Sequence, residues 1–163
     1  MWNLEFFIKL VSVTIGAMCF SMLFGVRPRH LPIATVGAAF TFVIYSLIEF
    51  FGMSLFSAAF ISTVIAAVYA EICARWRRAP AIVFLVPCLL PTIPGGSLYR
   101  TMSNLLARNY SVGLEYLMIT LKVSIGIAGG IVTVSLIVKV ITSFVDSIRG
   151  KRTVDHDEER TEI

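Results

Sequence analysis

Apolar residues dominate five long runs of this sequence, and charged residues lie almost entirely between the runs. A membrane-spanning helix needs about 20 mostly apolar residues, with about 17 to 25 tolerated. Five segments meet this requirement: residues 6–26, 31–48, 53–73, 81–98 and 117–145. The first four segments are joined by short links, so neighbouring helices are expected to run antiparallel. The pattern predicts an all-α integral membrane protein with a five-helix transmembrane domain over residues 1–148.

Three prolines and a glycine pair interrupt the fourth run. Proline removes a backbone donor and clashes with the carbonyl four residues earlier, so the helix is expected to break at Pro87, Pro91 and Pro94. Broken backbone at that depth is tolerated only inside protein or beside a water-filled cavity. Because discontinuous helices form binding sites in secondary transporters, this stretch is the first candidate for a functional site.

Basic residues follow the first, third and fifth runs and are absent from the link at residues 49–52. With five crossings, these three basic groups fall on one face, which the positive-inside rule assigns to the cytoplasm. The N-terminus is then outside and the C-terminus is cytoplasmic. The alternative is a re-entrant hairpin at residues 81–98, which would place the basic tail outside, against the same rule.

The composition agrees with a bilayer environment and changes how two further segments are interpreted. The chain is 57% hydrophobic and 15% charged, with a mean hydropathy of +0.85, and its net charge of +4 reflects orientation in the membrane rather than nucleic-acid binding. Residues 98–114 have amphipathic helical spacing and are expected to lie along the outer interface. Residues 149–163 are charged and lack aromatics, which predicts a disordered cytoplasmic tail.

Catalytic and metal chemistry are both disfavoured. Cys19, Cys73 and Cys88 lie in apolar segments and match no zinc or redox spacing, so they are interpreted as packing residues and no metal or cofactor is expected. An intramembrane enzyme would need a nucleophile with its base, paired carboxylates or metal ligands within the spans. The histidines lie outside the apolar runs and the acidic residues lie near span ends or beyond them, so no catalytic residue is predicted.

A new helix can begin after the break, with Ser97 or Gly96 as its cap. Its exposed amides and positive dipole end, with Arg100 one turn in, would suit a carboxylate. Lys122 either extends to the membrane interface or attracts an anionic substrate. The predicted substrate-binding residues are Pro91, Thr92, Pro94, Gly95, Gly96, Ser97, Arg100, Thr101 and Lys122. The alternative is that the prolines only kink the helix and Arg100 marks the membrane edge.

Small residues recur at helical spacing in two spans and predict close helix packing. They are Ser54, Ala58, Ser62, Ala66 and Ala70 in the third span, and Gly126 and Gly130 in the fifth. Which of these seams faces a partner is left open.

The break, Pro94-Gly95-Gly96-Ser97-Leu98-Tyr99-Arg100, and the preceding Arg75-Trp76-Arg77-Arg78-Ala79-Pro80 together resemble the small subunit of the threonine/serine exporter family. This family includes a two-component pair implicated in succinate export. The resemblance covers residues 1–148. A glycine often follows the first proline of the break in that family, whereas this chain has Cys88.

The resemblance implies a bacterial inner-membrane subunit that works with a second, related five-span protein. A half with an odd number of crossings leaves its successor upside down, so the two halves are expected to form an inverted pair. The predicted function is one half of a secondary exporter of small carboxylate-bearing metabolites, threonine and serine first and dicarboxylates such as succinate next. The competing hypothesis is a non-transporting membrane scaffold or assembly subunit.

Overall fold

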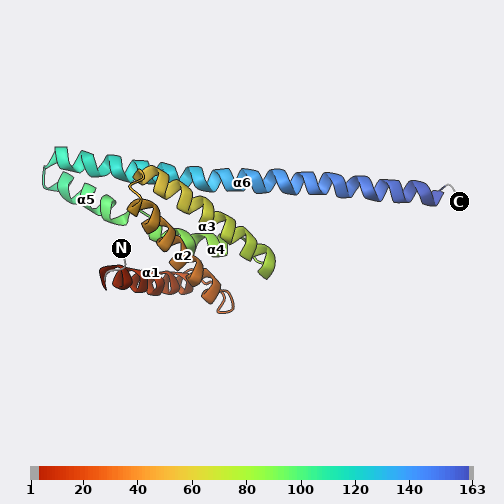
Figure 1. The fold of residues 1–163 in the computed structure, drawn as a ribbon, viewed down its shortest axis with the longest axis horizontal. Helices are drawn as coiled ribbons and strands as arrows, with labels where there is room; N and C mark the ends of the chain where they lie inside the picture. Colours follow the sequence, from red (N-terminus) through yellow and green to blue (C-terminus); the bar gives the residue numbers. More distant parts are fainter. Residues whose placement is uncertain (1–3, 162–163) are drawn as a thin grey trace. The chain divides into compact units, whose positions relative to one another are not determined.

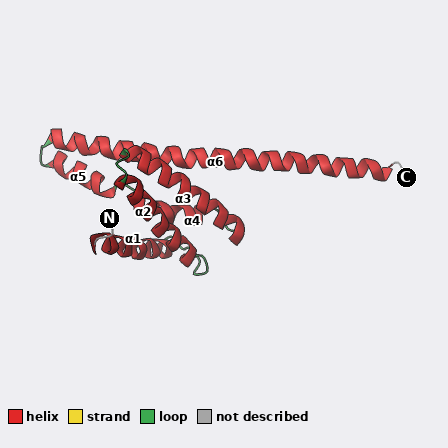
Figure 2. Ribbon diagram, in the orientation of Figure 1, coloured by secondary structure: helices red, strands yellow, loops and turns green. Residues whose placement is uncertain are grey.

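The computed structural model describes the backbone of residues 4–161 and the side chains of residues 4–144. Between residues 4 and 161 every regular element is a helix, which confirms the all-α class (Figure 2). The elements are α1 (Leu4–Leu23), α2 (Leu31–Phe50), α3 (Leu55–Arg77), α4 (Ile82–Leu89), the 3₁₀ helix η1 (Leu90–Thr92), α5 (Gly95–Leu106) and α6 (Tyr110–Thr161).

Four helices are long and apolar enough to cross a membrane: α1, α2, α3 and the part of α6 over Tyr110–Phe144. Ile82–Thr92 and Gly95–Leu106 pass the same test together, with a bend of 54° between them. The described residues therefore include four helices able to span a membrane, or five if the bent pair is one span. Its class as a multi-pass membrane protein follows from these helices, and the count of five stays a prediction.

Backbone contacts divide the chain into two compact units, Met1–Ile131 and Val132–Ile163. The second unit consists of the C-terminal part of α6, which continues as helix to Thr161. This differs from the disordered tail predicted over residues 149–163, of which residues 162–163 lie outside the described chain. Arg, Lys and Glu have high helix propensity, and extending an existing helix requires no new nucleus, so a charged tail can continue α6.

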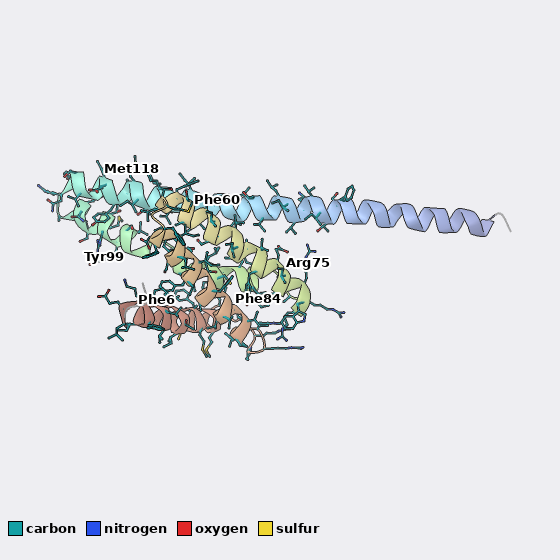
Figure 3. All side chains as sticks on the ribbon, in the orientation of Figure 1. Phe6, Phe60, Arg75, Phe84, Tyr99 and Met118 are labelled. Atoms are coloured by element: carbon teal, nitrogen blue, oxygen red, sulfur yellow. The ribbon has the colours of Figure 1, made fainter. Side chains whose placement is uncertain are left out.

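Packing in the first unit centres on α2, which contacts α1, α3 and α4 (Figure 1). One buried cluster joins Ala34 of α2 and Ala70 of α3 to Phe84 of α4, which is fully buried (Figure 3). A second joins Ala66 of α3 to Cys88 of α4. Small side chains let helix backbones approach closely where lipid removes the hydrophobic drive for association. The large apolar side chains are correspondingly exposed, as expected of a surface that faces lipid.

A residue with positive φ follows four of the described helices, and Gly52 after α2 (φ 73°) is one of them. The other three share one motif: Gly25 after α1 (φ 69°), Arg78 after α3 (φ 51°) and Arg108 after α5 (φ 60°). In each case the next amide donates to the carbonyl five residues earlier, which is the Schellman motif. These hydrogen bonds join Val26 to Ser21 (3.0 Å), Ala79 to Ala74 (3.0 Å) and Asn109 to Asn104 (2.9 Å). Only the first motif uses glycine, so the other two carry the steric cost of a β-carbon at that position.

These motifs explain where the helices extend beyond or stop short of the predicted segments. The third helix continues past residue 73 to Arg77, where Arg78 stops it. The amphipathic helix ends at Leu106 rather than at 114, because Arg108 turns the chain, and α6 begins at Tyr110 rather than at 117. In Figure 1, α5 lies beside the first turns of α6, and a β-carbon on Gly113 of α6 would lie 3.0 Å from Leu105 Cδ2 of α5.

Candidate functional site

Helix α4 ends in the proline-rich stretch because two amide donors are missing. Pro91 and Pro94 have no N–H to give to the carbonyls of Pro87 and Leu90, four residues earlier. The amide of Leu90 turns instead to the carbonyl of Pro87, three residues back, which begins the 3₁₀ turn. Ile93, which precedes a proline, is extended (φ −62°, ψ 125°). The chain resumes as α5 after the 54° bend.

The new helix begins two or three residues earlier than predicted. Pro94 occupies the N-cap position and provides no side-chain hydrogen bond, so neither Ser97 nor Gly96 is the cap. The amide of Gly95 donates to the Ile93 carbonyl (2.8 Å) and that of Leu98 donates to the Pro94 carbonyl (3.0 Å). The amides of Gly96 and Ser97 lie between them in the first turn, where a helix has no intrahelical acceptor to offer. They are the donors that a carboxylate could reach at this site.

Two threonines of the predicted site are buried and hydrogen-bonded to their own segments. Thr92 is 3% exposed and donates from Oγ1 to the Leu89 carbonyl at 2.7 Å. Thr101 is 2% exposed and donates from Oγ1 to the Ser97 carbonyl at 2.9 Å. Since each hydroxyl proton is already donated to a carbonyl, these side chains can only accept hydrogen bonds in this arrangement. They stabilise the ends of the interruption and do not add donors for an anion.

Arg100 is exposed and tied to α6. Its Nη1 donates to the hydroxyl of Tyr116 at 3.1 Å, and its guanidinium lies 5.4 Å from the centroid of the same ring. A cation at this distance from an aromatic ring is within the range of a cation–π contact. Tyr116 therefore holds Arg100 one turn after the start of α5, while leaving its other guanidinium donors free to meet a ligand.

Lys122 lies on α6 rather than in the interrupted segment. Its side chain is exposed, and it lines neither the cavity at the basic turns nor the apolar one beside Thr14 and Pro32. Figure 3 shows Tyr99, on the other hand, projecting from α5, where it is 73% exposed. The structure thus brings the predicted residues from Pro91 to Thr101 into one segment and leaves Lys122 outside it.

The predicted seams are filled within this chain. Ala66 and Ala70 face α2 and α4 in the two buried clusters, and Ala58 and Ser62 are also fully buried. Ser54 differs, since it is exposed and caps α3 by accepting a hydrogen bond from the Ser57 amide (3.2 Å).

The two glycines of α6 lie against the adjacent face of α3. A β-carbon on Gly126 would lie 2.9 Å from the Phe56 carbonyl oxygen, and one on Gly130 would lie 2.8 Å from Thr63 Cγ2. Real β-carbons do not come this close to other atoms, so only glycine fits at either position.

A cavity of about 540 Å³ lies between the α1–α2 turn and the α3–α4 turn. Its lining includes Arg27, Arg29 and His30 on the first turn, and Arg77 and Arg78 at the end of α3 and on the second turn. No carboxylate occurs among the described lining residues. The volume falls within the roughly 300–1,000 Å³ that is usual for ligand pockets.

Two nitrogen atoms of this cavity are buried without a hydrogen-bond partner in the described part of the chain: Nδ1 of His30 and Nε of Arg77. His30 is 9% exposed, and the edge of its ring meets Phe84 at a centroid distance of 5.5 Å. The Arg77 guanidinium lies 4.7 Å from the Trp76 ring centroid. Buried polar atoms are normally hydrogen-bonded, so these two call for an explanation.

Sequence reasoning assigns these arginines to membrane orientation and does not predict the cavity. The residues come from two turns about fifty positions apart, and only the packing of α2, α3 and α4 brings the turns together. A usable signal is present all the same. His30 directly follows a pair of arginines, at the start of a predicted span on the basic face.

Comparison with known proteins identifies the family. Residues 9–137 match the family described as Threonine/Serine exporter, ThrE, which covers most of the chain. No curated protein and no solved structure matches the chain. The match confirms the resemblance drawn from the Pro94–Arg100 and Arg75–Pro80 motifs, and the family is a class of transporters rather than of enzymes. The chain therefore belongs to the threonine/serine exporter ThrE family of membrane proteins.

Proposed function

We propose that this chain is one half of a two-component secondary exporter of small carboxylate-bearing metabolites. Threonine and serine are the first candidates for the cargo, and dicarboxylates such as succinate are the next. A second, related five-span subunit completes the transport path, in the bacterial inner membrane. The family match supports the exporter class, and the arrangement of α4, η1 and α5 supports the details.

The observation that carries the proposal is the interrupted segment from α4 to α5. Helix α4 stops at Leu89, and α5 begins at Gly95 after a bend of 54°. The interruption therefore creates a second helix N-terminus within the segment. The amides of Gly96 and Ser97, the positive end of the dipole and Arg100 then converge on one negative group. Half-helices with this polarity bind substrate carboxylates in other secondary transporters.

The glycine pair leaves this N-terminus open. A β-carbon on Gly95 or on Gly96 would meet nothing within 4 Å, and neither residue has a positive φ. The first unit therefore gives these glycines no packing role. Two residues without side chains at this point would allow a ligand or the partner subunit to reach the backbone amides.

Orientation follows from the basic turns. The arginines of the α1–α2 and α3–α4 turns line one cavity, so the two turns lie at the same end of the first unit. With the bent pair as one span, the positive-inside rule assigns this end to the cytoplasm and the N-terminus to the outside. A partner with an odd number of spans and the opposite orientation would then form an inverted pair with this chain.

A scaffold without transport activity is the competing function, and the small-residue seams are its main support. Those seams are occupied inside this chain by contacts among α2, α3, α4 and α6. They are therefore not surfaces waiting for a partner, which weakens the scaffold hypothesis.

Efflux assays test the proposal directly. Cells that express both subunits are loaded with threonine or with succinate, and export is compared at equal membrane abundance of each variant. Arg100→Ala and Gly95→Leu are expected to lower efflux by about tenfold or more, because each removes or blocks an interaction with the carboxylate. Arg108→Ala and Gly16→Leu are the matched controls, since Arg108 is an exposed arginine after α5 and Gly16 is another open glycine. Unchanged efflux in both site variants would favour the scaffold.

A further inference from the structure

We propose that the cavity between the α1–α2 turn and the α3–α4 turn is an oxyanion-binding site. Its ligand carries a carboxylate or phosphate group, supplied either by a small organic anion or by a phospholipid head group. Oxyanion binding does not depend on the exporter function, whereas identifying the ligand with the exported cargo does. The site lies on the two basic turns and is distinct from the Gly95–Arg100 segment.

The lining supplies donors suited to an oxyanion and no competing acceptor of the same charge. Arg27, Arg29, Arg77 and Arg78 present guanidinium groups, which pair with carboxylate and phosphate in a planar, two-pronged geometry. No described lining residue is acidic, so these charges are not neutralised within the cavity. Like charges gathered around one hollow repel one another, and a bound anion relieves that repulsion.

The unpartnered nitrogens point to a ligand more specifically than the charge does. His30 is more than nine-tenths buried, lines the cavity and has no partner for Nδ1 within the described residues. Nδ1 itself is covered, so rotation of the imidazole ring would be needed to bring it to an oxygen atom in the cavity, where it could donate in the tautomer with its proton on Nδ1. The buried Nε of Arg77 lacks a partner in the same way. Leaving such donors unpaired is unfavourable, and an oxyanion that drew the two side chains toward it would satisfy both.

Membrane orientation alone does not account for this construction. The positive-inside rule requires basic residues in the connecting loops and makes no demand on how they are packed. Orientation does not require a buried histidine, nor an arginine in the left-handed conformation where glycine is more favourable. Arg78 holds that conformation (φ 51°, ψ 47°) and lines the cavity.

The charge balance also selects among ligands. A zwitterionic amino acid brings an ammonium group, and no described lining residue offers a carboxylate to receive it. An anion with one or two negative groups and no positive group matches the lining better. We therefore expect succinate and inorganic phosphate to bind more tightly than threonine. The apolar side of the cavity, which includes Val83, Val86 and Pro87, can take the carbon chain of an organic anion.

The left-handed arginines give the test a matched pair of variants. Arg78→Gly and Arg108→Gly both remove an arginine from the left-handed position of a Schellman motif, where glycine is preferred, so both are expected to fold. Only Arg78 lines the cavity. The full-length chain is placed in nanodiscs of zwitterionic phosphatidylcholine and titrated with succinate, phosphate and threonine, with binding measured by calorimetry and by the shift in melting temperature.

The wild-type chain and Arg108→Gly are expected to bind succinate or phosphate with affinities within about twofold of each other. Arg78→Gly is expected to bind about tenfold or more weakly, as is usual for the loss of a hydrogen bond to a charged group. His30→Phe should also weaken binding while keeping the ring contact with Phe84. Equal losses in Arg78→Gly and Arg108→Gly would overturn the proposal, because they would indicate a general effect of surface charge.

A second arm identifies the source of the oxyanion. In nanodiscs that contain phosphatidylglycerol, a lipid ligand is expected to raise the melting temperature of the wild type and of Arg108→Gly more than that of Arg78→Gly. It would also compete with succinate. If the only ligand is a small anion, phosphatidylglycerol should change neither the melting temperature nor the affinity for succinate. Absence of binding in both arms would overturn the site, and efflux in the Gly95 and Arg100 variants would be unaffected by that result.

Discussion

A β-carbon on Gly37 of α2 would lie only 2.5 Å from Sγ of Cys88 on α4. The same carbon would lie 2.5 Å from Cε1 of Tyr69 on α3, so three helices converge on the bare face of one glycine. Cys88 follows Pro87 and is fully buried. Because Gly37 has no side chain, the sulfur of Cys88 fits against α2 at this point.

Gly37→Ala is therefore expected to destabilise the protein by about 1–3 kcal/mol, the usual effect of overpacking a close-packed interior. The change in melting temperature of the purified protein in detergent measures it. Gly16→Ala serves as the control, because nothing lies within 4 Å of a β-carbon there and alanine favours the helix. Adding Cys88→Ala should recover part of the loss, and a Gly37→Ala protein as stable as the control would contradict this packing.

The seam between α3 and α6 allows a sharper comparison of two adjacent glycines. A β-carbon on Gly130 would lie 2.8 Å from Thr63 Cγ2 and 3.1 Å from the Phe60 carbonyl oxygen, whereas one on Gly129 would meet the Phe60 ring at 3.5 Å, an ordinary contact distance. Gly130→Ala should lower the melting temperature, and Gly129→Ala should leave it unchanged or raise it. Equal effects at the two positions would show that backbone propensity, rather than contact with α3, governs this part of α6.

Arg78→Gly should raise stability while it weakens anion binding. The left-handed conformation is unfavourable by about 1–2 kcal/mol for a residue with a β-carbon, and glycine removes most of that penalty. Arg75→Gly, three residues earlier in the last turn of α3, should instead lower stability by about 1 kcal/mol, since glycine is a poor helix former. Thermal unfolding of the two variants checks the opposite signs, and a loss of stability in both would contradict the backbone geometry at Arg78.

The predicted topology of five crossings specifies which turns face the outside of the cell, and cysteine labelling can test it. In a chain freed of its native cysteines, Met53→Cys and Asn109→Cys should react in intact cells with a maleimide that cannot cross the membrane. Arg75→Cys should react only after the cells are opened, because it lies in a turn assigned to the cytoplasm. If α4 and α5 form a re-entrant loop, Asn109→Cys joins Arg75→Cys in the protected group, and the predicted orientation is wrong.

Local features of this fold follow from the sequence more readily than contacts between distant segments. The apolar runs predict α1, α2, α3 and the apolar part of α6, because a helix in lipid must satisfy every backbone donor internally. Pro91 and Pro94 likewise predict where helical hydrogen bonding fails, because proline has no backbone N–H to donate. Boundaries are less certain, as at Arg78 and Arg108, where a left-handed residue that is not glycine ends the helix.

The basic cavity could not be derived in this way. Arg27 and Arg78 have the same local meaning in the sequence, a charge beside an apolar run, whether or not they meet in space. The ring of His30 packs against Phe84, more than fifty residues away, so no local sequence pattern predicts its burial. Ser54 is a similar case. Its four-residue spacing from Ala58 predicts a packing residue, but the same spacing is compatible with the N-cap position that Ser54 occupies before α3.

The hydroxyl groups inside this bundle have one more consequence. Ser21, Thr41 and Ser62 are buried, and each donates to the carbonyl four residues earlier in its own helix. The protons of these three hydroxyls are therefore donated within their own helices, and at these positions shape rather than polar bridging matches the adjoining surfaces. Tyr69 is different, because its hydroxyl donates across to the Ile33 carbonyl of α2 at 2.8 Å. A solvent that competes for hydrogen bonds should have little effect at these three positions, whereas a methyl group added at a close contact such as Gly37 should weaken the packing.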